Sequence, residues 1–351
     1  MQRLCRIPGR ASPQFPHTPV TVQRCVAARH ATLLAVAEVT REELEASLAI
    51  LARECPDPRA GILGPQSVAW RLGGDLAVFL GGGRAALLQL AHPKVAFAVE
   101  HHSKTRTDVV GRFQRTFRNV FAMVFGELDD AFTAARRVHQ VHTRIRGEIP
   151  HAIGAWRAHT PYFANDPESL LWVHTTLVDT TIAVRERLDG ALPTALKDAY
   201  IVEMNRFAML FGIPRDLLPT SWAAHESYMS AKLISGEIAV APVAREMAQF
   251  LVGRGATSQP ALGRVAEAIT ATLLPEPLAI DFDLARSRLS NAAVRIALAT
   301  SAPIYRRLPK AAVAIPARSA ARRRIVGQPP SRFAAWTERQ LFGLSRQVTG
   351  S

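Results

Sequence analysis

Apolar residues recur at helical spacing along most of the chain, and this feature restricts its fold more than any other. Segments such as 129–146 and 168–188 place apolar residues three and four positions apart, which predicts helices with one buried face. No segment keeps the alternation of apolar and polar residues, bounded by turn pairs, that is typical of a β-strand. The sequence therefore predicts an all-α protein of about ten helices.

Local start and stop signals set the expected helix bounds. Thr40-Arg-Glu-Glu43 has the pattern of a capping box, and the helix that it opens is predicted to end before Pro56. Gly81-Gly82-Gly83 is predicted to be a helix–helix turn, because it lacks the phosphate-loop pattern and no strand precedes it. The other predicted helices cover residues 70–80, 84–90, 116–125, 129–146, 168–188, 196–211, 217–235, 243–252, 262–273 and 284–298.

The net charge of +14 is concentrated at the two ends of the chain. Residues 1–40 carry five arginines and one acidic residue, and residues 306–351 carry nine arginines, one lysine and one acidic residue. Residues 41–305 hold 28 basic and 27 acidic residues, so the body is nearly neutral. A nucleic-acid-binding domain carries its basic surface on the folded part, so no specific nucleic-acid partner is expected. The ends are expected to be solvated arms, with weak contact to anionic membrane surfaces as the alternative.

The chain contains no segment that predicts an integral membrane helix. Its longest uncharged stretch, between Arg10 and Arg24, is shorter than the roughly 18 apolar residues that a spanning helix needs. Its three cysteines, Cys5, Cys25 and Cys55, lie in the first sixth of the chain without CxxC spacing. This spacing excludes a disulfide framework and a structural zinc site.

The expected organisation has three parts. Residues 1–40 contain four prolines and no sustained period, so they are predicted to be a disordered basic segment. Their arginine-rich, nearly acid-free composition is similar to a transit peptide, and an over-extended gene start is the alternative. A helical domain is predicted over residues 41–312, followed by a basic tail at 313–351. The protein is predicted to be cytoplasmic, since the N-terminus lacks the apolar run of a secretory signal.

Histidines are the most informative residue type, because seven of the eleven lie between residues 92 and 159. His139 and His142 stand one turn apart on a long predicted helix with apolar neighbours. Each is expected either to be a core residue bonded to a carbonyl or to bind iron, as a single helical histidine does in b-type haem proteins. No Glu stands three residues before either histidine, so a di-iron carboxylate site is not expected.

Arg112, Arg115 and Thr116 form a second candidate group. Their i, i+3, i+4 spacing puts two guanidinium groups and a hydroxyl on one helix face. Two such charges repel unless an anion, a carboxylate or solvent lies between them. The pattern therefore indicates either an exposed basic stripe, arginines paired with buried acidic residues, or the polar side of a binding site.

Short motifs follow one another in a fixed order from about residue 61 to 230. They include Trp70-Arg-Leu-Gly-Gly-Asp75, Arg84 to His92-Pro93, His102-Ser103, Arg112-x-x-Arg115-Thr116, Val124-Phe125-Gly126, Val141-His142-x-Arg-Ile-x-Gly147, Pro161 to Pro167, Leu171-Trp172-Val173-His174 to Asp179, Gly212-Ile-Pro214 and Leu218-Pro219. In this series the chain resembles the MpaB/rubber-oxygenase catalytic domain family.

The resemblance implies a globin-like, all-helical domain that binds haem b. It also implies an oxygenase that acts with dioxygen on an unsaturated, apolar, isoprenoid-like small molecule. By motif, His142 matches the axial histidine of the iron, and Arg112, Arg115 and Thr116 match the distal group. Glu100 lies near the position at which the rubber-cleaving members carry a carboxylate that is proposed to act as a base. The rubber-cleaving members carry a lysine at the position of Arg115 that can occupy the sixth iron position, and arginine is too basic to do so.

The chemistry of these residue types agrees with the resemblance. A neutral His142 donates a lone pair to iron while its other ring nitrogen needs a hydrogen-bond acceptor. A cation and a hydroxyl on the opposite face can hydrogen-bond dioxygen and stabilise the negative charge that develops on it. An aromatic content of 7% with abundant Ala, Leu and Val suits a pocket for an apolar substrate. Two alternatives stay open: a haem peroxidase or peroxygenase, and a haem- or lipid-binding module without turnover.

The other histidines of the body are not expected to bind iron. Two of them, His92 and His174, are predicted to be structural. His101 and His102 flank Glu100 and are expected either to line the pocket or to face solvent. The others are expected to be surface or loop residues: His151, His159 and His225.

Overall fold

The computed structural model describes residues 38–102, 109–251, 260–284, 288–329 and 331, and helices predominate in these segments. The all-α prediction is therefore confirmed. The described strands are β1 (Arg146–Glu148) and β2 (Pro161–Phe163), which pair antiparallel with Gly147 opposite Tyr162. The prediction of disorder at residues 1–40 lies outside the described residues up to position 37.

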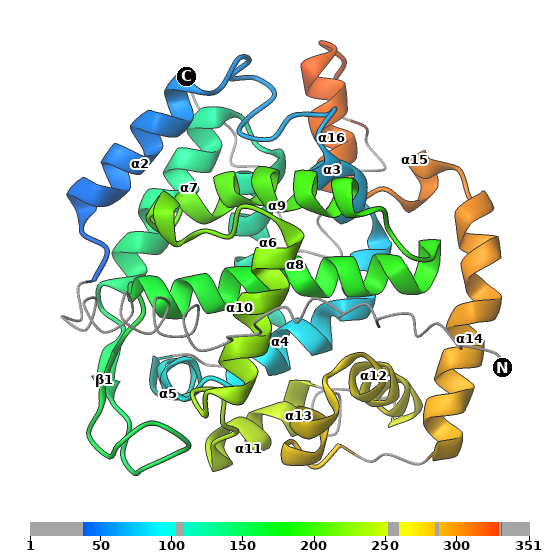
Figure 1. Cartoon of the computed structure of the whole chain (residues 1–351). Helices are drawn as coiled ribbons and strands as arrows, with labels where there is room; N and C mark the ends of the chain where they lie inside the picture. Colours follow the sequence, from blue (N-terminus) through cyan, green and yellow to red (C-terminus); the bar gives the residue numbers. More distant parts are fainter. Residues whose placement is uncertain (1–37, 103–108, 252–259, 285–287, 330, 332–351) are drawn as a thin grey trace, which may run out of the picture. The chain divides into compact units, whose positions relative to one another are not determined.

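Helices follow one another along the rest of the described chain (Figure 1). Their bounds are α2 (Arg41–Arg53), α3 (Val68–Gly73), the 3₁₀ helix η1 (Leu76–Gly81), α4 (Gly82–Leu90), α5 (Pro93–His102), α6 (Val109–Phe125), α7 (Leu128–His142), α8 (Pro167–Asp189), α9 (Thr194–Met209), η2 (Arg215–Leu217), α10 (Trp222–Ile234), α11 (Pro242–Leu251), α12 (Pro260–Leu273), α13 (Glu276–Asp281), α14 (Arg288–Arg307), α15 (Lys310–Val313) and α16 (Pro316–Ile325).

Helix α8 is the central element of the fold. Fourteen of its 23 residues are buried, and they are distributed around the helix, as expected for one enclosed by its neighbours. Asp166 caps its first turn, and Pro167 occupies the position where a missing N–H costs nothing. Buried threonines of α8 donate their hydroxyls to backbone carbonyls of the preceding turn, so these polar groups are satisfied inside the core.

Two apolar clusters lie on either side of α8. One contains Leu44, Leu72 and Phe207 and receives residues from α2, α3, α7 and α9. The other contains Leu87 and Met247 and receives residues from α4, α5 and α11 to α13. In Figure 1, α8 crosses the centre of the view with α7 and α9 above it and α4 and α5 below it. The core is thus two layers that share one helix.

Buried ion pairs attach α8 to its neighbours. Arg84 on α4 donates to Asp179 at 2.5 Å, to the Thr180 hydroxyl and to the Leu273 carbonyl. Burial raises the pKa of Asp179, but the contact with His225 at 3.4 Å and the charge of Arg84 outweigh burial, so this pKa lies below its ordinary value. This carboxylate therefore stays ionised inside the core.

The glycine triplet lies at a junction of two helices, as expected, but no turn separates them: Gly81 ends η1 and Gly82 begins α4. Chain segment 76–81 passes directly into α4 at Gly81 and Gly82. A Cβ at Gly81 would lie 2.4 Å from Thr180 Cγ2, and one at Gly83 would lie 2.1 Å from Thr270 Oγ1. These glycines allow η1 and α4 to approach α8 and α12.

Several predicted bounds are wrong. The capping box of Thr40 and Glu43 is confirmed. The helix expected over 70–80 is divided into α3 and η1, because the Asp75 side chain accepts hydrogen bonds from the Ala77 N–H and from Arg185. The helix expected over 129–146 ends at His142, and β1 follows it. After residue 312, in the segment predicted as a basic tail, α16 contributes the buried Ala321.

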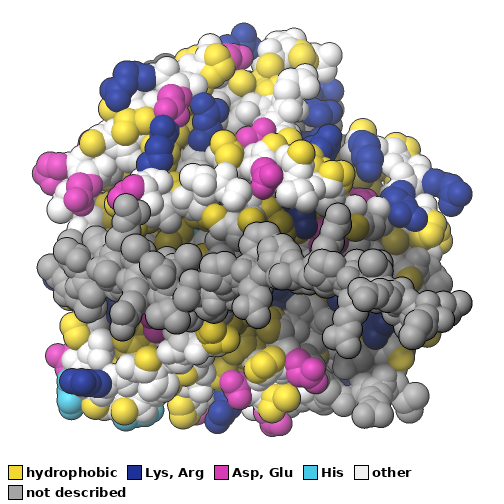
Figure 2. Space-filling view, viewed as in Figure 1, with side chains coloured by type: hydrophobic (Ala, Val, Ile, Leu, Met, Phe, Trp, Pro, Cys, Tyr) yellow, Lys and Arg dark blue, Asp and Glu magenta, His cyan; other side chains and the backbone are white. Residues whose placement is uncertain are grey.

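The described surface carries both signs of charge. Lys and Arg side chains lie interspersed with Asp and Glu side chains on the described part of the face in Figure 2. No helix in the described segments is long and apolar enough to cross a bilayer.

Replacing Arg84 with Met is expected to lower the free energy of unfolding by about 3–5 kcal/mol, because it leaves the Asp179 carboxylate buried without its main cation. Urea denaturation followed by circular dichroism measures this change. The control Arg187→Met alters an exposed arginine of α8, the helix that carries Asp179, and should change stability by no more than about 0.5 kcal/mol. Equal effects of the two substitutions would contradict a structural role for the buried pair.

Candidate functional site

His142 is the last residue of α7, and its ring is held in a nonpolar environment. Burial is the main cause that lowers its pKa to about 4, and the nearby His139 adds to this effect. The side chain of Asn165 and the backbone of Ala164 contact the ring and favour its charged form, but burial outweighs them. His142 is therefore neutral at physiological pH, the state in which imidazole binds a metal.

The hairpin of β1 and β2 brings Ala164 and Asn165 back to the end of α7. The Thr143 N–H bonds the His139 carbonyl as the helix closes, and the Ala164 N–H donates to the Ile145 carbonyl at 3.0 Å. Gly147 is needed here because a Cβ would lie 2.5 Å from the hydroxyl of the buried Tyr162. The position of His142 thus depends on residues about 20 positions further along the chain.

His139 differs from His142 although the two are one turn apart. Its side chain is buried, and its Nε2–H donates to the Val39 carbonyl at 2.8 Å. This is the core role that the sequence allowed for either histidine. By contrast, the buried Nδ1 of His142 has no hydrogen-bond partner among the described residues. Of the pair, His142 is therefore the one with a buried ring nitrogen that makes no hydrogen bond with the described residues.

Helix α6 carries the arginine motif beside α7. The two helices are joined by Gly126 and Glu127 and contact each other. His142 is 14 residues from the start of α7, and Gly111 is 14 residues from the end of α6. Because both helices rise equally per residue, the two residues lie at the same distance from the α6–α7 connection. Arg115 and Thr116 follow about one turn closer to the connection, and both side chains are exposed.

The predicted distal residues are thus brought near His142 along the chain but are not enclosed. The side chain of Arg112 lies outside what the structure describes. Glu100 is half-buried on α5, a helix that contacts both strands of the hairpin. His101 shares a 2.8 Å hydrogen bond with the Tyr162 hydroxyl, and His102 donates to the Arg146 carbonyl at 3.0 Å. These bonds fix the end of α5 to both strands of the β1–β2 hairpin.

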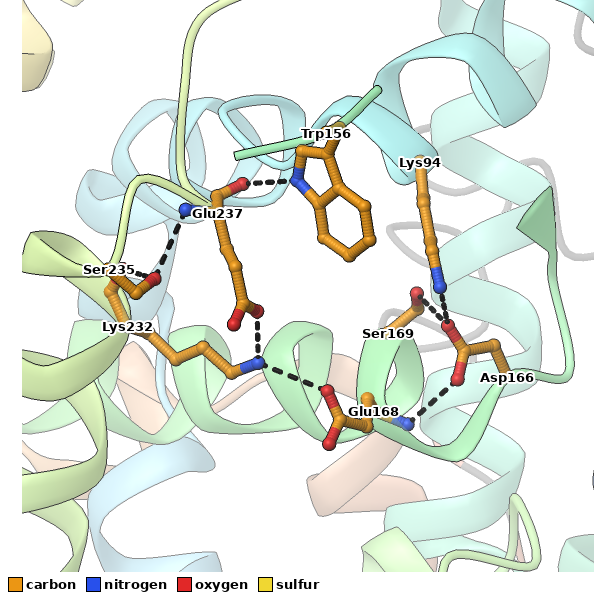
Figure 3. A network of polar contacts seen from close by, with 8 residues as sticks. All are labelled: Lys94, Trp156, Asp166, Glu168, Ser169, Lys232, Ser235 and Glu237. Atoms are coloured by element: carbon orange, nitrogen blue, oxygen red, sulfur yellow. Dashed lines mark hydrogen bonds and ion pairs between the residues drawn. The ribbon is translucent and has the colours of Figure 1, made fainter. Parts of the chain in front are cut away.

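A buried polar network lies beside this region, where α5, α8 and α10 meet (Figure 3). Lys232 contacts Glu168 at 3.2 Å and Glu237 at 2.5 Å, although only 5% of the lysine is exposed. Its pKa is raised: burial alone lowers it, but the two carboxylates outweigh burial. The sequence gives no sign of this network, because Lys94, Asp166 and Lys232 are distant from one another in the chain.

A second cation, Lys94, completes the network. It bonds Asp166 at 2.8 Å and lies 4.9 Å from the centroid of the Trp156 ring, and the Trp156 indole N–H donates to the Glu237 carbonyl. Ser169 donates to the same carboxylate of Asp166. Asp166 caps α8, and Asn165 directly precedes Asp166. The network therefore also holds Asn165, whose side chain contacts the His142 ring.

Three other histidines are buried in the core. His92 and His174 each have a pKa lowered to about 3, mainly by burial. His225, which was expected at the surface, is fully buried and stacks on Trp222, with its Nε2 3.4 Å from Asp179 Oδ1. That prediction is wrong because a single polar residue in a helix gives no sign of the buried carboxylate it faces.

An unpartnered ring nitrogen alone does not distinguish His142. The Nδ1 atoms of His92, His174 and His225 are also buried without a partner among the described residues. Each of those rings lies against an aromatic side chain, respectively Trp156, Phe207 and Trp222. His142 is instead half-buried at the end of a helix, beside α6 and the hairpin.

The described segments contain no group of three or more His, Cys, Asp or Glu residues that could hold a metal ion. A porphyrin supplies four equatorial nitrogens and requires only one axial ligand from the protein. The donor available at His142, a single neutral imidazole, fits haem in this respect.

The fold and the site define an all-α domain with a single candidate ligand histidine. The profile of the ER-bound oxygenase mpaB/B'/rubber oxygenase catalytic domain matches residues 70–307. The chain therefore belongs to this oxygenase family, which confirms the resemblance. No curated protein and no solved structure gives a significant match.

Stability is expected to fall in acid because of the buried histidines. Their folded pKa of about 3 lies below the ordinary value of 6.5, so the unfolded chain binds more protons between these values. Their contribution is complete above about pH 6.5 and decreases as the pH falls toward 3. Each histidine should account for about 2 kcal/mol of stability lost between pH 7 and pH 5.

Urea denaturation of the variant His174→Gln at pH 7 and pH 5 tests this expectation. The variant should lose about 2 kcal/mol less than the parent protein between the two pH values. His159→Gln is the control, since the side chain of His159 is 77% exposed, and it should leave the pH dependence unchanged. An unaltered pH dependence in His174→Gln would show that this ring is not buried in its neutral form.

Proposed function

We infer that the protein is a haem-b-dependent oxygenase that acts on an unsaturated apolar small molecule of the isoprenoid type. Membership of the oxygenase family supports the reaction class. The observation that carries the cofactor assignment is the neutral ring of His142 with its unpartnered Nδ1, at the motif position of the axial ligand. Bound haem supplies the iron that activates dioxygen.

The residues around His142 have separate roles in this proposal. His142 would hold the haem iron through a ring nitrogen, and the contacts from Ala164 and Asn165 orient the ring, as partners of ligating histidines generally do. Arg115 provides a permanent positive charge that stabilises negative charge developing on oxygen, and Thr116 provides a hydroxyl donor. Arg112 adds a second cation, and Glu100 accepts or holds a proton on the substrate side.

Replacing His142 with Ala is expected to abolish haem binding, since the chain then lacks the axial nitrogen. Absorption spectra after haem addition, with a pyridine haemochrome assay for stoichiometry, measure the result. His139→Gln is the matched control on the same helix, because its ring is already bonded to the Val39 carbonyl, and it should keep the Soret band. A parent protein without a Soret band, or His142→Ala with an unchanged one, would overturn the cofactor assignment.

Replacing Arg115 with Ala is expected to leave haem bound and to slow dioxygen-dependent turnover about a hundredfold, through loss of the charged donor. Oxygen consumption and product analysis with squalene as an apolar polyene probe measure this change. Arg118→Ala is the control, since Arg118 is an exposed arginine of the same helix α6, and it should keep parental turnover. Faster turnover with peroxide than with dioxygen would identify a peroxygenase, and haem binding without product would identify a binding module.

A further inference from the structure

A second site lies at the opposite end of α8 from His142. A cavity of about 400 Å³ is bounded by the end of α3, the end of α8, the start of α9, and α15 and α16. Its volume is in the lower part of the range of small-molecule sites. Figure 1 shows α3 and α16 next to each other near this end of α8, and Ala314 forms a β-bridge with Asp75 between them.

Two buried arginines in the cavity wall have donors without a partner. Arg185 is 4% exposed and uses Nε and Nη2 for the Leu72 carbonyl, the Arg71 carbonyl and Asp75. Its buried Nη1 makes no hydrogen bond with a described residue, and the Asp189 carboxylate lies 3.6 Å from it. Arg318 is 8% exposed, donates from Nη1 to the Gly74 carbonyl, and leaves its buried Nε without a partner.

The cavity wall has an excess of positive charge. Four cations line it, of which Lys310 and Arg71 are exposed, against the two carboxylates of Asp75 and Asp189. Asp75 is already engaged by Arg185 at 2.6 Å and by the Ala77 N–H. Burial, with repulsion from Arg322 and Arg185, lowers the pKa of Arg318, so its charge is not fully compensated. Buried unsatisfied donors and uncompensated charge are both costly without a ligand.

The rest of the wall is apolar. Leu72, Leu192 and Leu196 face the same cavity. The combination of charged donors on one part and leucines on another matches a ligand with an anionic head and a short hydrocarbon chain. The family profile ends at residue 307, and Lys310 and Arg318 follow it, so the site is completed by residues outside the matched span.

We propose that this cavity binds a small amphiphilic anion, with a carboxylate or phosphate head group at Arg185 Nη1 and Arg318 Nε and a short apolar chain against the three leucines. Guanidinium groups suit both head groups because their donors match two oxygens of a planar or tetrahedral oxyanion. The site is separate from His142 and does not depend on the proposed haem chemistry.

Isothermal titration calorimetry of the full-length chain tests the proposal with four probes: octanoate, octyl phosphate, inorganic phosphate and octanol. Octanoate or octyl phosphate should bind with 1:1 stoichiometry, and the tighter of the two identifies the head group. Octanol and inorganic phosphate should each bind at least tenfold more weakly, since each lacks one half of the ligand. Equal binding of octanol would overturn the anionic part, and equal binding of inorganic phosphate would overturn the amphiphilic part.

Variants locate the binding. Arg318→Met should weaken binding of the tighter probe at least tenfold, and Lys310→Met, a change at an exposed position, should weaken it about threefold. Arg323→Met is the matched control, since this arginine of the same helix α16 donates to the Pro329 carbonyl and does not line the cavity. If Arg318→Met does not fold, the affinities of Lys310→Met and Arg71→Met for the tighter probe test the site instead. Unchanged affinity in both variants would overturn the proposal.

His142→Ala separates this site from the proposed haem site. It should leave binding of the tighter probe unchanged, whether or not it removes haem. Loss of probe binding in His142→Ala, or the same affinity in Arg318→Met and Arg323→Met, would overturn the proposal. A failure of haem binding in the parent chain would leave these results unaffected.

Discussion

Burial of α8 is the constraint on which the rest of the structure depends. A helix enclosed on all sides must neutralise the charges that it carries, because an unpaired charge in the core costs several kcal/mol. Asp179 is satisfied by Arg84 and His225, and Arg185 by Asp75 and backbone carbonyls of α3. These partners come from α4, α10 and the α3–η1 connection, so neutralising the charges of α8 also positions the helices around it.

The two candidate sites lie at the two ends of this helix. At its start, Asp166 caps the first turn and binds Lys94, and the preceding Asn165 contacts the ring of His142. At its end, Arg185 holds Asp75 and lines a cavity, and its Nη1 lies 3.6 Å from the Asp189 carboxylate without a hydrogen bond. A rigid buried helix is well suited to hold ligand-binding groups at fixed positions, because Leu171 and Trp172 near its start, and Val184 and Leu188 near its end, are packed in apolar clusters.

The sequence was sufficient for the features that depend on local pattern, and insufficient for those that depend on distant residues. Helical spacing and the capping box at Thr40 predicted the all-α class and the start of α2 correctly. The end of α7 at His142 was missed because the hairpin that stops it is held by Tyr162, and the burial of His225 was missed because its partner Asp179 is 46 positions away. Charge neutralisation in a core cannot be read from spacing along one helix.

The distinction between His139 and His142 illustrates the same limit at the candidate site. Both lie on α7 with apolar neighbours, so periodicity alone gives them equal weight as ligands. The Val39 carbonyl reaches Nε2 of His139 from a segment 100 positions earlier, and this bond assigns that ring to the core. The same geometry leaves His142 with an unpartnered nitrogen and a neutral ring. The two histidines therefore differ because the backbone carbonyl of Val39, outside the helix, bonds only His139. This contact depends on the fold and cannot be predicted from the spacing along α7.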